Sequence, residues 1–529
     1  MSDNSSKKST FRKKKYHAVY LPFPDVYDQG GPEAFNNLER KNSSERNLIV
    51  LPFDFIETLY RLETVELSMG ARDAQIYIKD SKDKKLDFNF KEGSTLYRAR
   101  EGLDLLILDD ATFSKPNFSI TELKRYIDEF VSFNEFKIIT NDARHHIKYS
   151  GRGMDVEDPG FLQVNESIVH EGIILGNDKL QAKLFSSDSR SLDLGLVMEL
   201  LDKELYMNQF VKFSGAKGTK YARVTGKLDW NVNKTRIIGV DKPELKLLND
   251  REYDRLLKPC VNNSNALKIL GVGPRDMEQY LALQYGLFNK DISLFFLCGK
   301  AGSGKTLLTY ATAVDSVLLY DQNQREVRAQ SGISNKFYRQ ITLLKPPEIL
   351  GGSRRDPGAL PGTLLDKLKP HLRPYIDAHR ETIMKDFPFN EMFKHPKYEN
   401  DYGSPRNKEI SSKSINGGKL PDMEVIDLIY SGFIGGASIR DTFIVIDEAQ
   451  DFTPYEMKTI IERIAEGSKI IICGDAMQTR NPKCTPKVNG LTFAIKHFLP
   501  KHYSGLVYLN KNYRDQASED SDSMRAYNT

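Results

Sequence analysis

The chain has 529 residues, of which 40% are hydrophobic and 28% are charged, and its formal net charge is +4. One hydrophobic core does not grow to this length, so we expect two or three domains. The net charge is small for the length and does not by itself indicate nucleic-acid binding. No apolar run approaches the roughly 18 residues that a membrane span needs, so we expect a soluble protein without a membrane partner.

The N-terminus and the cysteines bear on cellular location. Residues 1–16 are polar and basic, and we expect them to form a disordered tail because they cannot bury enough apolar surface. No apolar segment follows the basic residues, which argues against a secretory signal. Cys260, Cys298, Cys473 and Cys484 lack the paired spacing of zinc ligands. A reducing cytoplasm is the expected location.

Between residues 17 and 164, apolar strand-like segments alternate with helical segments. This alternation predicts a parallel α/β domain. The expected strands are 17–21, 47–51, 105–108 and 136–140, and the expected helices are 55–66 and 120–133.

The rest of the chain falls into three parts. Residues 165–265 carry short strand-like segments, at 210–213 and 221–224, between Gly and Asn turns, which predicts a β-rich connector. Residues 266–515 return to alternating strands and helices, which predicts a second α/β domain. Residues 516–529 are polar, and we expect a flexible tail.

The clearest motif is Gly-Lys-Ala-Gly-Ser-Gly-Lys-Thr at 299–306, which has the P-loop pattern GxxxxGK[ST]. An apolar run at 294–298 leads into it, and a helical segment at 307–311 follows it. Strand, loop and helix in this order are the context that the motif requires. The sequence therefore predicts an ATP site formed by Gly299, Lys300, Ala301, Gly302, Ser303, Gly304, Lys305 and Thr306.

Each part of this motif has a chemical role. Gly302 and Gly304 let the backbone wrap closely around a polyphosphate, so that successive N–H groups and the helix N-terminus face the anion. Lys305 then neutralises the β and γ phosphates of ATP. Thr306 offers its hydroxyl to Mg²⁺.

Two later strands are expected to end beside the P-loop. The apolar run 443–446 ends in Asp447 and Glu448, at the sheet edge where ligands of such folds bind. Asp447 is placed to hold the Mg²⁺ shell, and Glu448 to orient or deprotonate the attacking water. The run 470–473 leads to Gln478, which is either beside the γ phosphate or an ordinary polar loop residue.

The order of these three motifs resembles that of superfamily 1 helicase-like motors. Further segments between about residues 270 and 515 resemble the PhoH-like P-loop ATPase family. These segments are 273–279, 358–362, 366–370, 441–451, 457–467, 489–491 and 509–514. The resemblance implies a Mg²⁺-dependent ATPase that couples hydrolysis to binding or unwinding RNA or another single-stranded nucleic acid.

The same resemblance assigns residue roles. Gln279 lies in a segment that resembles an adenine-reading Q motif, Gln478 matches a sensor of the γ phosphate, and Arg514 matches an arginine finger or sensor. In a homo-oligomeric ring, Arg514 would act across a subunit boundary. The chain departs from the family at 435–437, where an arginine-rich loop is usual, and at Lys345, where arginine is common.

The N-terminal α/β domain resembles the PIN nuclease domain that precedes the ATPase in one subgroup of the family, through segments 51–57, 70–72 and 138–142. PIN sites gather carboxylates around one or two divalent ions that position water for phosphodiester cleavage. Glu57 and Asp142 match ligand positions for Mg²⁺ or Mn²⁺.

Other acidic positions of a PIN site are replaced. Pro22 stands where the leading aspartate is expected, and the usual paired aspartates are missing around residues 119–122. Asp25, Asp109 and Asp110 are either substitute ligands or ordinary loop carboxylates. These departures favour a PIN-like domain that binds RNA or a partner over one that cleaves RNA.

Three functional hypotheses stay open. The favoured one is a PhoH-like RNA motor with a weakened PIN-like domain, the second is an ATP-gated binding switch or scaffold, and the third is an active ribonuclease. A polar insertion at 389–420 either contacts nucleic acid or is solvated surface. Its aromatic residues Phe389, Tyr398 and Tyr402 either stack on bases or pack locally.

Overall fold

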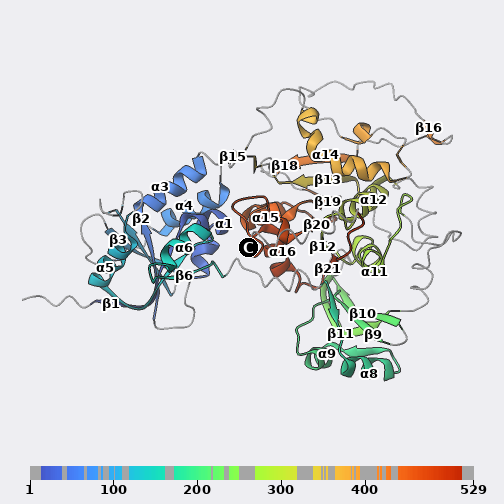
Figure 1. Cartoon of the computed structure of the whole chain (residues 1–529), viewed down its shortest axis with the longest axis horizontal. Coiled ribbons are helices and arrows are strands. Elements are labelled where there is room, and N and C mark those ends of the chain that lie inside the picture. The colour runs from blue at the N-terminus through green and yellow to red at the C-terminus, as the bar shows by residue number, and fades with distance from the viewer. Residues whose placement is uncertain are drawn as a thin grey trace, which may run out of the picture. The chain divides into compact units, whose positions relative to one another are not determined.

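The computed structural model divides the chain into two compact units (Figure 1). One comprises Met1–Gln163 with Thr453–Glu456, and the other comprises Val164–Phe452 with Met457–Thr529. The structure describes residues 13–38, 45–64, 68–81, 85–86, 94–100, 102–109, 113, 118–160, 172–215, 218–231, 237–248, 269–318, 338–346, 349–350, 353–354, 364–382, 384–385, 389–393, 414–415, 418–419, 425–430 and 439–514.

The first unit is a six-stranded sheet in the order β3-β4-β2-β1-β5-β6. Neighbouring strands run parallel except β3 and β4. The strands are β1 (Lys14–Pro22), β2 (Asn47–Pro52), β3 (Ser94–Arg100), β4 (Leu103–Leu108), β5 (Val131–Ile139) and β6 (Asp155–Glu157). The helices are α1 (Pro24–Gly30), α2 (Glu33–Asn36), α3 (Phe53–Thr64), α4 (Met69–Ser81), α5 (Ile120–Phe130) and α6 (Ala143–Ser150). The parallel α/β prediction is confirmed for this region, with one antiparallel edge.

The uninterrupted apolar runs form strands that are buried on both faces. Along β2, Leu48 and Val50 join one hydrophobic core, whereas Ile49 and Leu51 join the other. Both cores need apolar residues, so the strand does not alternate between apolar and polar positions. Because β1, β2 and β5 run parallel, their carboxyl ends meet at one edge of the sheet.

The predicted tail at 1–16 extends too far, because β1 begins at Lys14. Tyr16 is fully buried, and its hydroxyl donates to Asp104 Oδ2 at 2.9 Å. Lys14 Nζ lies 2.6 Å from the same oxygen. A buried carboxylate from a distant strand therefore orders these basic residues, which local composition does not reveal.

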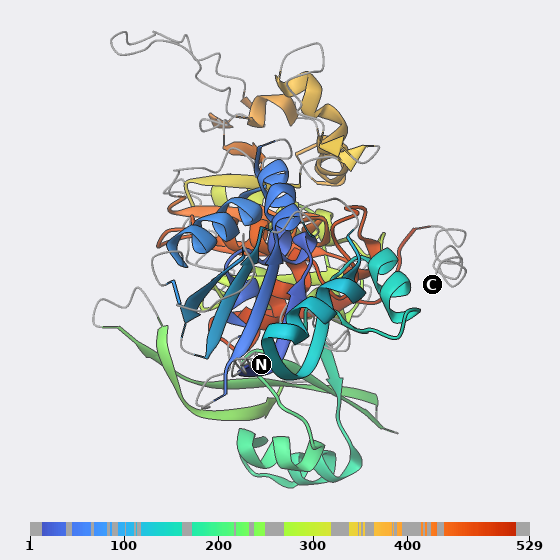
Figure 2. The same cartoon turned by 90° about the vertical axis from the view of Figure 1, so that its left-hand side faces the viewer.

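The connector is a five-stranded sheet in the order β7-β9-β10-β11-β8, in which β10 and β11 form a long hairpin (Figure 2). Its strands are β7 (Ile173–Leu175), β8 (Ser191–Asp193), β9 (Phe210–Gly215), β10 (Gly218–Trp230) and β11 (Ile237–Leu247). It also contains two helices, α8 (Asp178–Ser186) and α9 (Leu194–Leu201), which the β-rich prediction missed. The side chains of Asn177 and Asp193 cap these helices.

The connector packs against the C-terminal domain within the second unit. Asn208 Nδ2 donates to the carbonyls of His502 at 3.0 Å and Ser504 at 2.7 Å. The guanidinium of Arg223 lies over the ring of Tyr285, 5.1 Å from its centroid.

The C-terminal domain is built on a parallel six-stranded sheet in the order β18-β13-β19-β20-β12-β21. The strands are β12 (Leu294–Gly299), β13 (Gln340–Lys345), β18 (Ile426–Tyr430), β19 (Thr442–Ile446), β20 (Lys469–Gly474) and β21 (Ser504–Leu509). The longer helices are α11 (Met277–Leu281), the π-helix η2 (Ala282–Leu287), α12 (Lys305–Leu318), α14 (Leu364–Arg380), α15 (Pro454–Ile461) and α16 (Gly490–Phe498). Short elements are β14 (Ile349–Leu350), β15 (Ser353–Arg354), β16 (Ser414–Ile415), β17 (Gly418–Lys419), η4 (Phe389–Met392), η6 (Ala449–Asp451) and η7 (Ala476–Gln478).

Helices cover both faces of this sheet (Figure 1). Phe295 and Leu297 of β12 share a core with α12 and α14. Phe296 and Cys298 share the other core with α15 and α16. The predicted strands at 294–298, 443–446 and 470–473 are confirmed.

Several predictions concern residues outside the described ranges: Asp110, Tyr398, Tyr402, the segments 358–362 and 435–437, and the tail 516–529. Phe389 of the insertion packs locally, with its ring centroid 5.5 Å from that of His379 and 5.0 Å from that of Phe393. In the described part of the chain, none of the helices combines the length and hydrophobicity needed to cross a bilayer.

Candidate functional site

The P-loop connects β12 to α12 through three glycines with positive φ. The φ angles are 151° at Gly299, 76° at Gly302 and 92° at Gly304. A Cβ at Gly302 would overlap the side chains of Asn512 and Arg514. Side chains are therefore excluded there both by backbone conformation and by close neighbours.

Lys305 and Thr306 open the first turn of α12. Lys305 Nζ donates to the loop carbonyls of Gly299 at 2.5 Å and Lys300 at 2.9 Å. Thr306 is partly exposed. The lysine therefore lies over the concave side of the loop, where an incoming phosphate can exchange for the two carbonyls.

Gln279 is buried behind the loop. Its Nε2 donates to Ser303 O at 2.9 Å, and its Oε1 accepts the Arg275 N–H at 2.8 Å. One end of the amide thus supports the P-loop, and the other end holds the segment before α11. A contact with adenine stays a prediction.

The segment after β21 closes over the P-loop. Asn510 donates to the Glu278 carboxylate from its backbone N–H at 2.7 Å and its side chain at 2.9 Å. Tyr513 N–H donates to Gly302 O at 3.0 Å, and its hydroxyl donates to Asp276. The stem of Arg514 lies beside Gly302. Sequence reasoning missed Asp276 and Glu278, whose only signal was their place in the segment resembling a Q motif.

Asp447 lies at the carboxyl end of β19 and is buried. Its Oδ2 accepts the Tyr375 hydroxyl at 2.9 Å and lies 3.4 Å from Lys345 Nζ. Its Oδ1 accepts the Glu448 N–H at 3.1 Å. The Tyr375 hydroxyl and the Lys345 ammonium thus hold Oδ2, whereas Oδ1 keeps a lone pair for a further ligand.

Glu448 adopts a left-handed backbone conformation, with φ at 53°. Gln450 Nε2 donates to its Oε2 at 2.8 Å, and Arg480 Nη2 lies 3.7 Å from its Oε1. Its side chain is 41% exposed, so the carboxylate is oriented yet open to water. Positive φ in a non-glycine residue is a form of strain that occurs at functional sites.

Hydrogen bonds connect the ends of β19 and β20. Gln450 Oε1 accepts the Asp475 N–H at 3.0 Å, and Gln478 Nε2 donates to Asp475 Oδ2 at 2.6 Å. Glu448 and Gln478 therefore share one network. Gln450 and Asp475, which sequence reasoning did not single out, join them.

Cys473 lies at the end of β20, beneath these groups. Its Sγ is 3.4 Å from the Thr309 hydroxyl. Burial, with a smaller contribution from the nearby Asp447, raises the pKa of the Cys473 thiol to about 12. The thiol is neutral near pH 7, which excludes a nucleophilic role.

The donor set suits Mg²⁺, which prefers oxygen ligands and keeps several waters. The Thr306 hydroxyl and the Oδ1 lone pair of Asp447 are oxygen donors from the ends of neighbouring elements of one site. The phosphates that usually accompany Mg²⁺ would bind to the backbone N–H groups of the P-loop.

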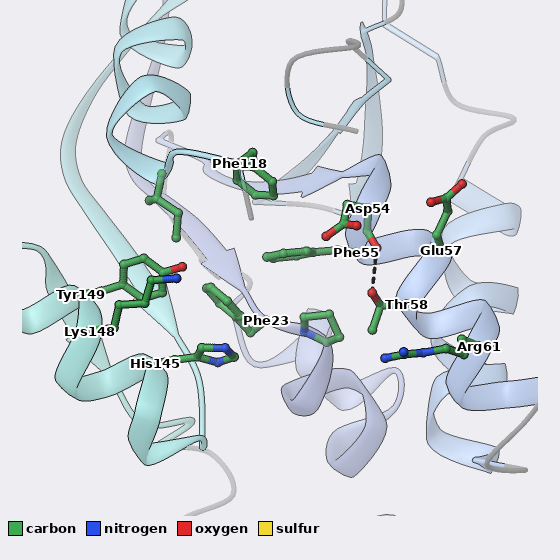
Figure 3. Close-up of a pocket in the computed structure, with 12 residues that line it drawn as sticks. Phe23, Asp54, Phe55, Glu57, Thr58, Arg61, Phe118, His145, Lys148 and Tyr149 are labelled. Atoms are coloured by element: carbon green, nitrogen blue, oxygen red, sulfur yellow. Dashed lines mark hydrogen bonds between the residues drawn. The ribbon is translucent and has the colours of Figure 1, made fainter. Parts of the chain in front are cut away.

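The N-terminal unit has its own cavity, of about 510 Å³, at the carboxyl edge of its sheet (Figure 3). Its lining residues are Phe23, Pro24, Asp54, Phe55, Glu57, Thr58, Arg61, Phe118, Ile120, His145, Lys148 and Tyr149. Phe23 lies at the centre, with ring centroids 4.9 Å from Phe55 and 4.4 Å from His145. Phe23 thus contacts both Phe55 of α3 and His145 of α6.

Glu57 and Asp142, the predicted metal pair of this unit, have different surroundings, and their metal role stays a prediction. Glu57 lines the cavity, whereas Asp142 caps α6 and is bound by Arg144, whose Nη2 lies 2.5 Å from its Oδ2. This hydrogen bond is the main cause that holds the pKa of Asp142 below its usual range. Within the described ranges, no three His, Cys, Asp or Glu side chains are grouped to hold a metal ion.

Two of the three alternative ligands of this unit, Asp25 and Asp109, lie within the described residues. Asp25 accepts the Asn141 N–H at 2.6 Å and the Thr140 hydroxyl at 3.2 Å, and burial raises its pKa to about 6. Asp109 is exposed at the end of β4. Asp25 therefore joins the start of α1 to the loop that follows β5.

The family comparison matches the C-terminal region. Residues 271–520 match the family model described as PhoH-like protein. Protein PhoH2 of Bacillus subtilis (strain 168) is 34% identical over 246 residues, which cover 46% of each chain. A PhoH-like protein of the same organism is 27% identical over 242 residues, covering 46% of this chain and 58% of that protein. The chain spans about half the length of these curated relatives.

One solved structure with local likeness is the crystal structure of Pif1 helicase from Candida albicans. It is 15% identical, covers 47% of this chain and 43% of its own, and has a TM-score of 0.20. A TM-score this low supports no argument about fold or activity.

The family match contains every residue of the site at the ends of β12, β19 and β20. It excludes the N-terminal unit, whose PIN-like character stays a prediction. Residues 271–520 of this chain are therefore similar to the PhoH-like family, and the P-loop motif lies within them.

Proposed function

We propose that the PhoH-like region hydrolyses ATP with Mg²⁺. The observation that carries this proposal is the meeting of three motifs at one sheet edge: the P-loop after β12, Asp447 and Glu448 after β19, and Gln478 after β20. Ligands of open parallel sheets bind at this edge. The residues to which the proposal assigns phosphate, metal and water contacts thus lie at one edge of the sheet.

In this proposal, the P-loop N–H groups and the α12 N-terminus bind the ATP phosphates. Lys305 leaves the carbonyls of Gly299 and Lys300 and pairs with the β and γ phosphates. Thr306 and Asp447 hold Mg²⁺, which when bound neutralises charge on the phosphates. The left-handed conformation at Glu448 and the bond from Gln450 orient the carboxylate that accepts a proton from water.

Gln478 and Arg514 complete the site. Gln478 shares the hydrogen-bond network of Glu448 and responds to loss of the γ phosphate. Arg514, whose stem lies beside Gly302, supplies positive charge to the transferred phosphoryl group. In a homo-oligomeric ring, it serves a neighbouring subunit instead.

The direct test is ATP turnover by Lys305→Ala and Glu448→Gln variants. Loss of the lysine charge is expected to lower the rate by about 10²–10³-fold. Loss of the general base is expected to lower it by about 10²–10⁴-fold. Lys501→Ala and Glu462→Gln, at residues remote from the P-loop, are the matched controls. Parental turnover in either site variant would overturn the proposal.

We further propose that hydrolysis is coupled to RNA or another single-stranded nucleic acid in the cytoplasm. The PhoH-like match supports the coupling, and the buried reduced thiols of Cys298 and Cys473 fit a reducing compartment. The rival hypothesis is an ATP-gated switch or scaffold. Single-stranded RNA raises the ATPase rate of a motor and leaves that of a switch unchanged.

For the N-terminal unit, we propose binding of RNA or a partner without cleavage. The supporting observation is that Phe23, Phe55 and His145 occupy the carboxyl edge of the sheet, where a nuclease needs clustered carboxylates. Arg144 also neutralises Asp142. Arg61 and Lys148 supply positive charge at the cavity.

A further inference from the structure

We propose that Lys345 is a counter-ion for Asp447, and that it makes binding of a divalent cation conditional on nucleotide phosphate. The inference rests on the proposed function, in which Asp447 helps to hold Mg²⁺. Lys345 is thus a positioning residue that acts through Asp447.

The Lys345 side chain is buried between Asp447 and Tyr375. The residue ends β13, which pairs with β19. Its Nζ lies 3.4 Å from Asp447 Oδ2, and each side chain is only 8% exposed. The ammonium also lies over the ring of Tyr375, 5.0 Å from the centroid, while the Tyr375 hydroxyl donates to the same Oδ2. One carboxylate oxygen is therefore held from two sides.

The burial of Lys345 bears on three possible roles: a nucleic-acid contact, a structural ion pair, and a counter-ion for a metal ligand. A lysine that contacts a nucleic-acid backbone must reach solvent, whereas this ammonium faces the protein interior. A purely structural ion pair affects folding stability alone when it is broken. A counter-ion at a metal ligand also affects how strongly that ligand attracts a cation.

The charges predict that Lys345 lowers the affinity of Asp447 for a divalent cation. A divalent cation at the Oδ1 side of Asp447 is attracted by the carboxylate and repelled by the ammonium behind it. Because both groups are buried, solvent screens this repulsion only weakly. The negative charge of nucleotide phosphates is then needed to favour the cation, so metal and nucleotide enter together.

The test uses Mn²⁺ as the probe, titrated against the full chain without nucleotide and followed by electron paramagnetic resonance. Lys345→Gln keeps a hydrogen-bond donor but removes the charge, and Lys345→Met keeps the stem. Each is expected to bind Mn²⁺ on the order of tenfold more tightly than the parent. Lys345→Arg keeps the charge and is expected to match the parent. Circular dichroism checks that each variant is folded.

Three outcomes would overturn the proposal. They are parental Mn²⁺ affinity in the folded neutral variants, a gain in affinity in Lys345→Arg, and tight Mn²⁺ binding at Asp447 in the nucleotide-free parent. The last is decisive even if the neutral variants do not fold. Adding Asp447→Asn to each neutral variant separates the two proposals. If the added Mn²⁺ binding survives this change, the metal role of Asp447 in the proposed function fails.

Discussion

At the residue scale, the protonation of Asp25 is coupled to the stability of the fold. Burial raises its pKa in the folded chain from 3.8 to about 6. The folded state therefore binds an extra proton between these pH values, so the free energy of unfolding falls as pH rises from about 4 to about 6. A pKa shift of about two units lowers the free energy of unfolding at pH 7 by on the order of 3 kcal/mol, relative to its value below pH 4.

Asp25→Asn is expected to remove this dependence, because the amide oxygen can still accept the Asn141 N–H without carrying a charge. Urea unfolding at a series of pH values between 4 and 7 measures the effect. The variant should be more stable than the parent at pH 7 and similar to it at pH 4. An unchanged slope in the variant would show that Asp25 is not the group responsible.

At the scale of elements, Lys469 joins the start of β20 to the π-helix η2 and the turn after it. Its Nζ donates to the carbonyls of Gly286 at 2.8 Å, Asn289 at 2.8 Å and Ile292 at 2.7 Å, and the residue is 2% exposed. Carbonyls at the end of a helix need such donors when they are buried.

Lys469→Met is expected to lower the free energy of unfolding by about 3 kcal/mol, because it removes charge-assisted hydrogen bonds and leaves buried carbonyls unsatisfied. Chemical denaturation of the full chain measures the loss. Lys501→Met, at an exposed lysine in the same region, is the matched control. Equal stability of the Lys469 variant and the control would contradict this role.

For the whole molecule, we expect that the N-terminal unit leaves RNA uncleaved and that the other unit hydrolyses ATP faster when RNA is present. A labelled single-stranded RNA incubated with Mn²⁺ should remain intact, because Asp142 is bound by Arg144 and does not line the cavity with Glu57. The same RNA should raise ATP turnover severalfold. Both are measured on one preparation, by gel and by phosphate release.

A contaminating nuclease is recognised with Asp142→Asn. Cleavage that disappears in this variant would establish an active ribonuclease and contradict the binding role proposed for the N-terminal unit. Cleavage that persists comes from another protein. Neither result affects the ATPase proposal, which concerns the other unit.

The sequence by itself determined the features that depend on contiguous residues. The run at 294–298 and the motif at 299–306 predict strand, loop and helix start, because glycine spacing and strand hydrophobicity are local properties. The buried strand ending at Asp447 was also predictable, since strands that are covered on both faces are uniformly apolar. Periodicity placed the end of α5 too late, because Val131 already begins β5.

Only the tertiary structure decided which distant side chains meet. It binds the Gln279 amide to Ser303, pairs Lys345 with Asp447, and binds Asp142 to Arg144. These contacts depend on strand order and on how far each side chain reaches, which composition and motif spacing do not contain. Local chemistry therefore determined where phosphate binds, whereas packing decided which charges compensate one another around it.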